Sequence, residues 1–331
     1  MNQNTTGTNG ELLKVENLKT YFPIRKGLLR RTAGFIRAVD GVSFSIKKGR
    51  TLGLVGESGC GKTTVARSII RLVPATAGTV SFEGTDVLSA GTAALRKVRR
   101  QISLIFQDPF GSLNPRMTVG SIIGEPLKVS KGTSGSELAE RVALLLTKVG
   151  LSAGYINRYP HEFSGGQRQR IGIARALSLE PKLVICDEPV SALDVSIQSQ
   201  ILNLLKDLQE EFGLTFLFIA HDLAVVEFFC DVVAVMYMGR IVEKAPSQEL
   251  YRNPLHPYTR ALMSAIPQVE GAVRGGPGKS GGEPPGASKL PDGCAFSPRC
   301  PLAEDRCLKQ PPALKEKSDY KGHFVACWKN K

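Results

Sequence analysis

The chain has 331 residues, of which 42% are hydrophobic and 22% are charged, a composition that can bury a core and excludes wholesale disorder. Its 43 lysines and arginines outnumber 30 aspartates and glutamates, so the formal net charge is +13. This excess predicts an anionic partner, namely nucleic acid, an acidic lipid surface or nucleotides. Apolar runs stay below the roughly 18 residues of a membrane-spanning helix, and residues 1–14 lack a secretory signal. We therefore expect a cytosolic protein with one large domain and a smaller appendage.

Along most of the chain, apolar segments typical of strands alternate with segments whose apolar residues recur at helical spacing. Strands are predicted over residues 12–16, 42–46, 51–55, 183–186, 215–220 and 232–237. Helices are predicted over residues 63–72, 137–149 and 197–212. Strands that alternate with helices indicate an α/β fold, in which helices cover both faces of a parallel sheet.

The composition changes after Ile266. Glycine and proline dominate residues 271–293, which predicts a flexible linker over residues 267–293. Residues 294–331 form a short tail with four of the seven cysteines, namely Cys294, Cys300, Cys307 and Cys327. An odd number of cysteines in a reducing compartment argues against a disulfide framework. The tail is too small to fold on a hydrophobic core alone, so another source of stability is expected.

A phosphate-binding pattern, G-x-x-x-x-G-K-[ST], stands between a predicted strand and a predicted helix. Its residues are Gly56, Glu57, Ser58, Gly59, Cys60, Gly61, Lys62 and Thr63, and Thr64 follows. Backbone N–H groups of such a loop surround phosphate oxygens, and Lys62 reaches the β- and γ-phosphates. The Thr63 hydroxyl is expected to bind Mg²⁺. The pattern therefore predicts a site for ATP and Mg²⁺.

Two carboxylates, Asp187 and Glu188, follow the apolar strand at residues 183–186. In ATPases with a phosphate loop, a strand-end acid holds Mg²⁺ through water, a role that suits Asp187. Glu188 would then orient or deprotonate the attacking water. An acidic pair before a proline is also compatible with a simple turn, but the upstream phosphate loop favours catalysis.

A second anion-binding pattern opens a helix after Phe163. It consists of Ser164, Gly165, Gly166 and Gln167, which put small residues and free N–H groups at a helix N-terminus. Together with Phe163 they resemble the LSGGQ signature of the ATP-binding subunits of ABC transporters, and the resemblance covers nearly the whole chain. It implies a P-loop NTPase cassette over residues 11–266, with a RecA-like core, an amino-terminal antiparallel β-subdomain and a helical subdomain at about residues 108–175.

The resemblance also implies how the motifs work together. Two cassettes would pack head to tail around ATP, so that the signature of one caps the nucleotide in the phosphate loop of the other. Gln107 resembles the glutamine that contacts Mg²⁺ and water, and Asp194 belongs to a loop that crosses the dimer interface. His221 resembles the histidine that contacts the γ-phosphate. An aromatic residue near the amino end stacks on adenine in this family, a place that Phe22 takes, with Tyr21 one register away.

Four segments resemble the oligopeptide/dipeptide importer group in particular, namely residues 56–62, 106–115, 253–259 and 293–301. The implied cargo is short peptides, with nickel complexes or oligosaccharides as alternatives. The implied partners are a second ATPase subunit, with a heterodimer favoured, two membrane permeases and an extracytoplasmic peptide-binding protein. The implied location is the cytoplasmic face of the membrane. A soluble ABC ATPase acting on nucleic acid is the rival interpretation, but the chain has one cassette and lacks the long insertions typical of that class.

The four tail cysteines are spaced C-x5-C-x6-C-x19-C. This spacing lacks the close pair with which zinc sites typically begin. Four thiolates also suit a [4Fe–4S] cluster, and the resemblance favours that cluster on Cys294, Cys300, Cys307 and Cys327. Zinc and metal-free thiols are the alternatives.

Overall fold

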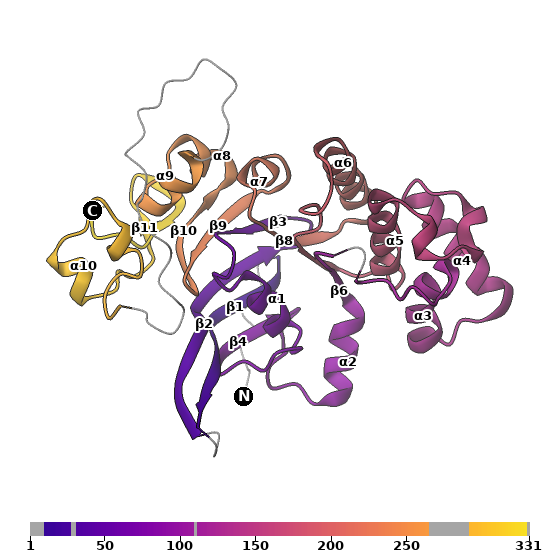
Figure 1. Ribbon diagram of the computed structural model, residues 1–331, viewed down its shortest axis with the longest axis horizontal. Helices are drawn as coiled ribbons and strands as arrows, with labels where there is room; N and C mark the ends of the chain where they lie inside the picture. Colours follow the sequence, from indigo (N-terminus) through magenta and orange to yellow (C-terminus); the bar gives the residue numbers. More distant parts are fainter. Residues whose placement is uncertain (1–9, 28–30, 109–110, 265–290, 330–331) are drawn as a thin grey trace, which may run out of the picture.

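Two β-sheets and several layers of helices build the protein in this computed structural model, which describes residues 10–27, 31–108, 111–264 and 291–329 (Figure 1). The larger sheet has the strand order β11-β12-β10-β9-β3-β8-β7-β6. Its strands are β3 (Thr51–Val55), β6 (Ile102–Ile105), β7 (Leu183–Asp187), β8 (Thr215–Ala220), β9 (Val232–Tyr237), β10 (Arg240–Pro246), β11 (Lys315–Lys317) and β12 (Tyr320–Val325). From β6 to β9 neighbouring strands are parallel, as the alternation of strands and helices predicts.

Alternate residues of the central strands face two separate hydrophobic cores. Leu217 and Ile219 of β8 belong to one core, whereas Phe216 and Phe218 belong to the other. Because side chains alternate across a strand, both faces of this sheet must be covered. From Phe216 to Ala220 the sequence of β8 is therefore continuously apolar rather than alternating between apolar and polar residues.

A smaller antiparallel sheet covers one face of the larger one, with helix α1 (Lys62–Ile69) between them (Figure 1). Its strands are β1 (Glu11–Lys26), β2 (Arg31–Lys47), β4 (Ala77–Phe82) and β5 (Thr85–Asp86). The predicted strands at 12–16 and 42–46 are parts of the longer β1 and β2, which pair as a ribbon beyond the core. Exposed Phe35 and Ile36 show why periodicity missed this extension, since the ribbon buries neither face fully.

Helices cover the opposite face and one end of the larger sheet. They are α5 (Gly165–Leu177), α6 (Val195–Phe212), α7 (Leu223–Phe229), α8 (Ser247–Arg252) and α9 (Pro257–Ser264). The end away from the tail also holds α3 (Val119–Lys131) and α4 (Gly135–Lys148), whereas α2 (Thr92–Gln101) precedes β6 (Figure 1). The α/β class and the antiparallel β-subdomain are thus confirmed. The predicted linker falls outside the described residues except for positions 291–293, as does the predicted cassette end at Ile266.

The tail joins the larger sheet directly. Strand β12 pairs antiparallel with β10, with Val325 opposite Glu243. Glu243 is fully buried there, and its Oε1 lies 2.7 Å from Nε2 of buried His323. The two carboxylate oxygens also accept hydrogen bonds from the backbone N–H groups of Leu255 and His256, at 2.7 and 2.9 Å. Strand pairing and this polar cluster therefore supply the stability that the tail's small core cannot.

The predicted iron–sulfur cluster in the tail is wrong. Throughout the described ranges, which include Cys294, Cys300, Cys307 and Cys327, no group of three or more His, Cys, Asp or Glu residues is arranged to hold a metal ion. That finding applies equally to the zinc alternative. Burial raises the pKa of the Cys294 thiol to about 11 and also raises that of Cys300, which favours neutral thiols over metal-binding thiolates.

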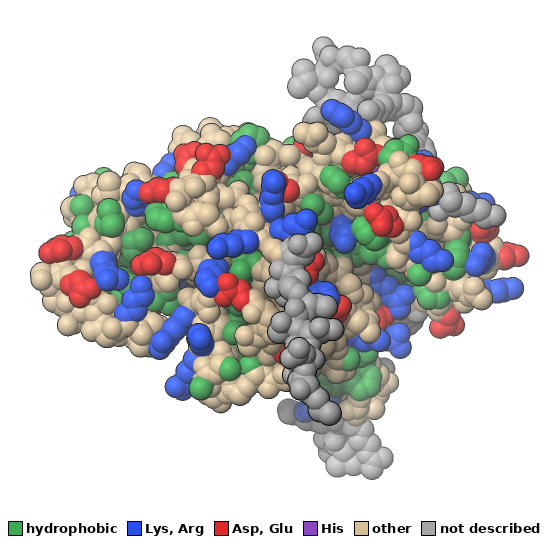
Figure 2. Space-filling model, turned by 180° about the vertical axis from the view of Figure 1, so that it is seen from behind, with side chains coloured by type: hydrophobic (Ala, Val, Ile, Leu, Met, Phe, Trp, Pro, Cys, Tyr) green, Lys and Arg blue, Asp and Glu red, His purple; other side chains and the backbone are tan. Residues whose placement is uncertain are grey.

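Basic side chains are distributed over many elements. Figure 2 shows lysines and arginines spread over one face of the molecule and interleaved with acidic side chains. On this face the basic side chains that contribute to the net charge of +13 thus form no single stripe.

Candidate nucleotide-binding site

The phosphate loop, residues 56–63, connects buried β3 with α1 and requires glycine at two close contacts. Gly56 has φ 153° and Gly61 has φ 109°, values that other residues rarely adopt. A Cβ atom at Gly56 would lie 2.1 Å from the Met236 carbonyl oxygen, and one at Gly61 would lie 2.1 Å from that of Ala38. The glycines therefore let the loop pass directly against the neighbouring backbone.

Lys62 is held inside the curve of the phosphate loop. Its side chain is only 4% exposed, and its Nζ donates hydrogen bonds to the carbonyl oxygens of Gly56, at 2.7 Å, and Glu57, at 3.1 Å. The same Nζ lies 3.9 Å from Oε1 of Glu188. The ammonium group is thus already positioned between the loop and the acidic end of β7.

Thr63 and Asp187 bring hard oxygen ligands together from two elements. The Thr63 Oγ1 donates a hydrogen bond of 2.9 Å to Oδ1 of Asp187, the last residue of β7. Burial raises the pKa of Asp187, partly offset by that hydrogen bond, so a nearby cation would favour the ionised carboxylate. A hydroxyl and a carboxylate are ligands that Mg²⁺ prefers, and these two residues therefore fit that ion.

Three polar residues meet at the carboxyl ends of adjacent strands. Gln107 follows β6, Glu188 follows β7 and His221 follows β8. The Gln107 Nε2 donates to Glu188 Oε2 at 2.9 Å, and His221 Nδ1 lies 3.1 Å from the same oxygen. Glu188 has a backbone φ of 50°, a strained value for a residue other than glycine and one that is frequent at active sites.

The signature residues cap helix α5. Ser164 Oγ accepts from the Gln167 N–H at 3.4 Å, and the Gln167 side chain accepts from the Ser164 N–H at 3.1 Å. This reciprocal capping box fixes the helix start. Gly166 packs so closely on Ile197 of α6 that a Cβ atom on Gly166 would lie only 2.6 Å from the Ile197 side chain. Asp194 precedes α6 and caps it through its backbone carbonyl.

The two aromatic candidates for adenine stacking differ in their surroundings. The Tyr21 hydroxyl donates a hydrogen bond of 2.6 Å to Asp40, and burial raises the pKa of Tyr21 to about 12. Phe22 is 39% exposed on the next position of the same strand. Because successive strand residues point to opposite faces, only one of the two can face the nucleotide.

Sequence patterns did not identify Tyr258 and Arg299 as residues that contact the phosphate loop. The Glu57 N–H donates to the Tyr258 hydroxyl at 2.9 Å, and the Glu57 carboxylate pairs with Arg299 of the tail. Tyr258 lies within residues 253–259 and Arg299 within residues 293–301, two of the segments that resemble the peptide importer group. Nothing in the local pattern indicates that they meet the phosphate loop.

Fold and motifs define an ATP-binding cassette. Residues 39–191 match the family model described as ABC transporter, and residues 242–307 match the model described as oligopeptide/dipeptide transporter, C-terminal region. The chain belongs to the ATP-binding proteins of the ABC transporter family and is an ABC ATPase. None of the helices in the described segments is long and apolar enough to span a membrane.

Similar proteins match over almost their full length. The chain is 53% identical to the oligopeptide transport ATP-binding protein AppF of Bacillus subtilis, with 97% of this chain and 98% of that protein covered. It is 52% identical to the oligopeptide transport ATP-binding protein OppF of Escherichia coli, with 96% of each covered. Among solved structures, the post-hydrolysis dimer of the cassette MJ0796 with ADP and Pi is similar, with a TM-score of 0.63 and 29% identity. That match covers 71% of this chain and 98% of MJ0796.

Proposed function

We propose that this chain hydrolyses ATP to power the import of short peptides through a membrane transporter. The convergence of Gln107 and His221 on Glu188, beside Lys62, carries the proposal for hydrolysis. The peptide cargo is supported by relatives of matching length that are named oligopeptide transport ATP-binding proteins.

In this mechanism Lys62 and the N–H groups of the phosphate loop bind the β- and γ-phosphates. Thr63 and Asp187 would hold Mg²⁺, which supplies positive charge to the phosphate oxygens. Glu188 accepts a proton from the attacking water, and Gln107 orients that water. His221 contacts the γ-phosphate from the neighbouring strand end and holds the Glu188 carboxylate in place.

A head-to-tail dimer would complete the site. Helix α5 places Ser164, Gly165 and Gly166 at its N-terminus, which suits a phosphate of ATP held by the opposite cassette. Asp194, at the start of α6, would lie at the same interface. The dimeric structure of the cassette MJ0796 bound to ADP and Pi supports the pairing of two cassettes. We favour a heterodimer with a second ATPase subunit, at the cytoplasmic face of the membrane.

Two permease subunits and an extracytoplasmic peptide-binding protein would complete the transporter. The experiment is co-purification from membranes with the permeases and companion ATPase, followed by reconstitution and measurement of ATP-dependent uptake. Labelled peptides of two to five residues are expected to enter. Nickel complexes and oligosaccharides serve as the alternative cargo. Uptake of one of these alternatives without peptide uptake would overturn the peptide assignment.

Phe22 is the proposed adenine platform. We expect Phe22→Ala to raise the KM for ATP by about tenfold, because a stacked aromatic ring contributes roughly 1–3 kcal/mol to base binding. Tyr21→Phe is the matched control, since it removes only the hydroxyl bound to Asp40 and retains the ring. Steady-state ATPase assays on these two variants and on Tyr21→Ala check this assignment, and a larger KM increase for Tyr21→Ala than for Phe22→Ala would assign the platform to Tyr21.

A further inference from the structure

Arg299 of the tail forms a two-point ion pair with the phosphate loop. Its Nη1 lies 2.9 Å from Oε2 of Glu57, and its Nη2 lies 3.0 Å from Oε1. The Arg299 side chain is 10% exposed and that of Glu57 is 28% exposed, so water screens the pair less than a surface pair. The hydrogen bonds to Glu57 raise the pKa of Arg299. Such bidentate pairs are the strongest and most directional that arginine makes with carboxylates.

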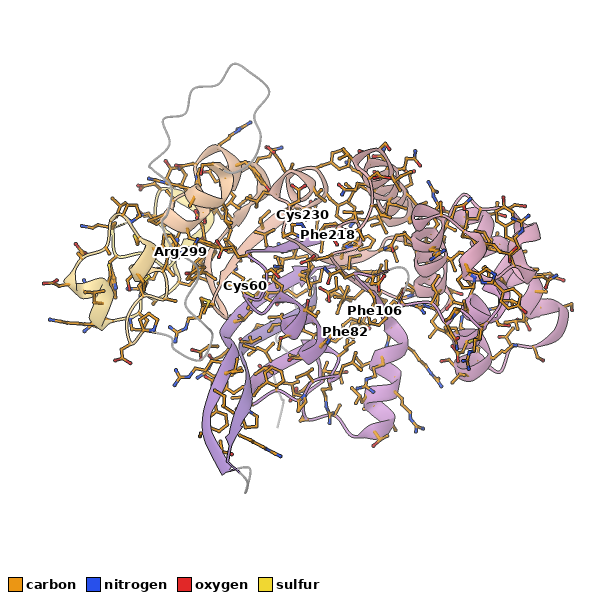
Figure 3. All side chains as sticks on the ribbon, in the orientation of Figure 1. Cys60, Phe82, Phe106, Phe218, Cys230 and Arg299 are labelled. Atoms are coloured by element: carbon orange, nitrogen blue, oxygen red, sulfur yellow. The ribbon has the colours of Figure 1, made fainter. Side chains whose placement is uncertain are left out.

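Aromatic residues hold this arginine at the junction of tail and cassette, where Figure 3 labels it. The guanidinium carbon lies 5.9 Å from the ring centre of Tyr237 and 5.8 Å from that of Phe296. Phe296 in turn packs against Tyr258, whose hydroxyl accepts the Glu57 N–H. Residues after the cassette core therefore hold Glu57 through both its backbone and its side chain.

Glu57 places a negative charge close to the expected position of the nucleotide. Its carboxylate belongs to a loop whose proposed ligand, the triphosphate of ATP, is itself strongly anionic. Like charges in a partly buried site repel each other and weaken binding. Arg299 offsets the carboxylate without occupying the inner curve of the loop, which Lys62 fills through its bonds to Gly56 and Glu57.

Simple anchoring of the tail does not require this pair. The tail is already attached through pairing of β12 with β10 and through the buried contact of His323 with Glu243. The pair instead joins residues 242 positions apart in sequence, one of them inside the phosphate loop.

We propose that Arg299 is a positioning residue for nucleotide binding. Its guanidinium neutralises the Glu57 carboxylate beside the site of the phosphates, so the tail controls the affinity of the cassette for ATP. This inference rests on the proposed function of the phosphate loop as the ATP site.

The test is the Kd for the Mg²⁺ complex of the β,γ-imido analogue of ATP, measured by calorimetry on the full chain. We expect Arg299→Gln to raise this Kd about tenfold, because Glu57 then faces the phosphates without its partner. The double variant Arg299→Gln with Glu57→Gln carries no charge at either position. Its summed charge is therefore zero, the same as that of the intact ion pair. Its Kd is expected to return to within about threefold of the original value. Arg299→Lys keeps the charge and is expected to give an intermediate value.

Rescue by the second substitution separates electrostatic positioning from tail anchoring. An anchoring role predicts that the double variant stays as weak as Arg299→Gln, and that result would overturn the proposal. Should Arg299→Gln fail to fold, Glu57→Gln alone decides, because removal of the carboxylate must then lower the Kd rather than leave or raise it. Lys329→Gln is the control, since this tail lysine pairs with Glu304 at 2.6 Å and its loss should leave the Kd unchanged.

Failure of the underlying function has a different signature. Lys62→Ala removes the ammonium group of the phosphate loop and is expected to abolish binding of the analogue. If Lys62→Ala binds like the original protein, the ATP site itself is misassigned. If Lys62→Ala loses binding but Arg299→Gln, while folded, does not weaken it, only the role of Arg299 is refuted.

Discussion

Replacing Glu188 with glutamine is expected to lower the rate constant of ATP hydrolysis by about 100-fold or more, because a positioned general base contributes roughly 10²–10⁴ in rate. Glutamine keeps the shape of the side chain and can still contact Gln107 and His221, but it cannot accept a proton. Binding of MgATP should therefore survive while turnover is lost. The ATP-bound dimer should then accumulate and appear by size-exclusion chromatography.

Glu180→Gln is a closely matched control for this variant. Glu180 also has a positive backbone φ, 53° against 50° for Glu188, and the substitution removes the same charge. Its side chain is 75% exposed and pairs with Lys131 at the surface. Single-turnover and steady-state assays should find Glu180→Gln unaffected. Equal turnover by the Glu188 variant and its control would refute the assignment of Glu188.

Replacing Glu243 with glutamine is expected to destabilise the protein by about 3 kcal/mol, the cost of leaving a buried polar group in a hydrogen-bonded cluster without its partner. Both oxygens of Glu243 accept hydrogen bonds, from Leu255, His256 and His323. The amide NH₂ of glutamine must face at least one of these donors, so a buried donor loses its acceptor. Because the donors come from both the cassette and the tail, the tail should also become susceptible to proteolysis.

Denaturant unfolding and limited proteolysis measure this effect. Glu227→Gln in α7 is the control, because Glu227 is exposed and surface substitutions of this kind typically change stability by less than about 0.5 kcal/mol. A Glu243 variant with the same unfolding midpoint and protease resistance as the Glu227 variant would show that the buried cluster does not hold the tail.

Local patterns predicted much of the cassette. The strand, glycine-rich loop and helix around Lys62 are contiguous, and burial of β7 and β8 on both faces appears in the sequence as uninterrupted apolar runs. The order of β6, β7 and β8 in the sheet then explains why residues that follow each strand come together.

Long-range polar pairs could not be predicted in this way. Glu243 and His323 are 80 positions apart, and each lies in a short strand that carries other polar residues as well, so nothing in the local pattern singles it out. The cysteine spacing was misinterpreted for a related reason, since four thiols in a short tail resemble a ligand set until their surroundings are known. In the folded tail the four thiols line one small cavity with side chains such as Phe296 and Trp328, but within the described residues they are not arranged to hold a metal ion.

Pairing of the tail with β10 also determines how the sheet ends. A long strand at a sheet edge presents unpaired N–H and C=O groups to any other extended chain and so invites aggregation. Here β12 covers β10, and the final position is left to β11, which is only three residues long and consists of Lys315, Glu316 and Lys317. A short edge made of charged residues disfavours further strand addition. A cassette truncated before the tail would expose β10 as an open edge, with the Glu243 carboxylate beside it.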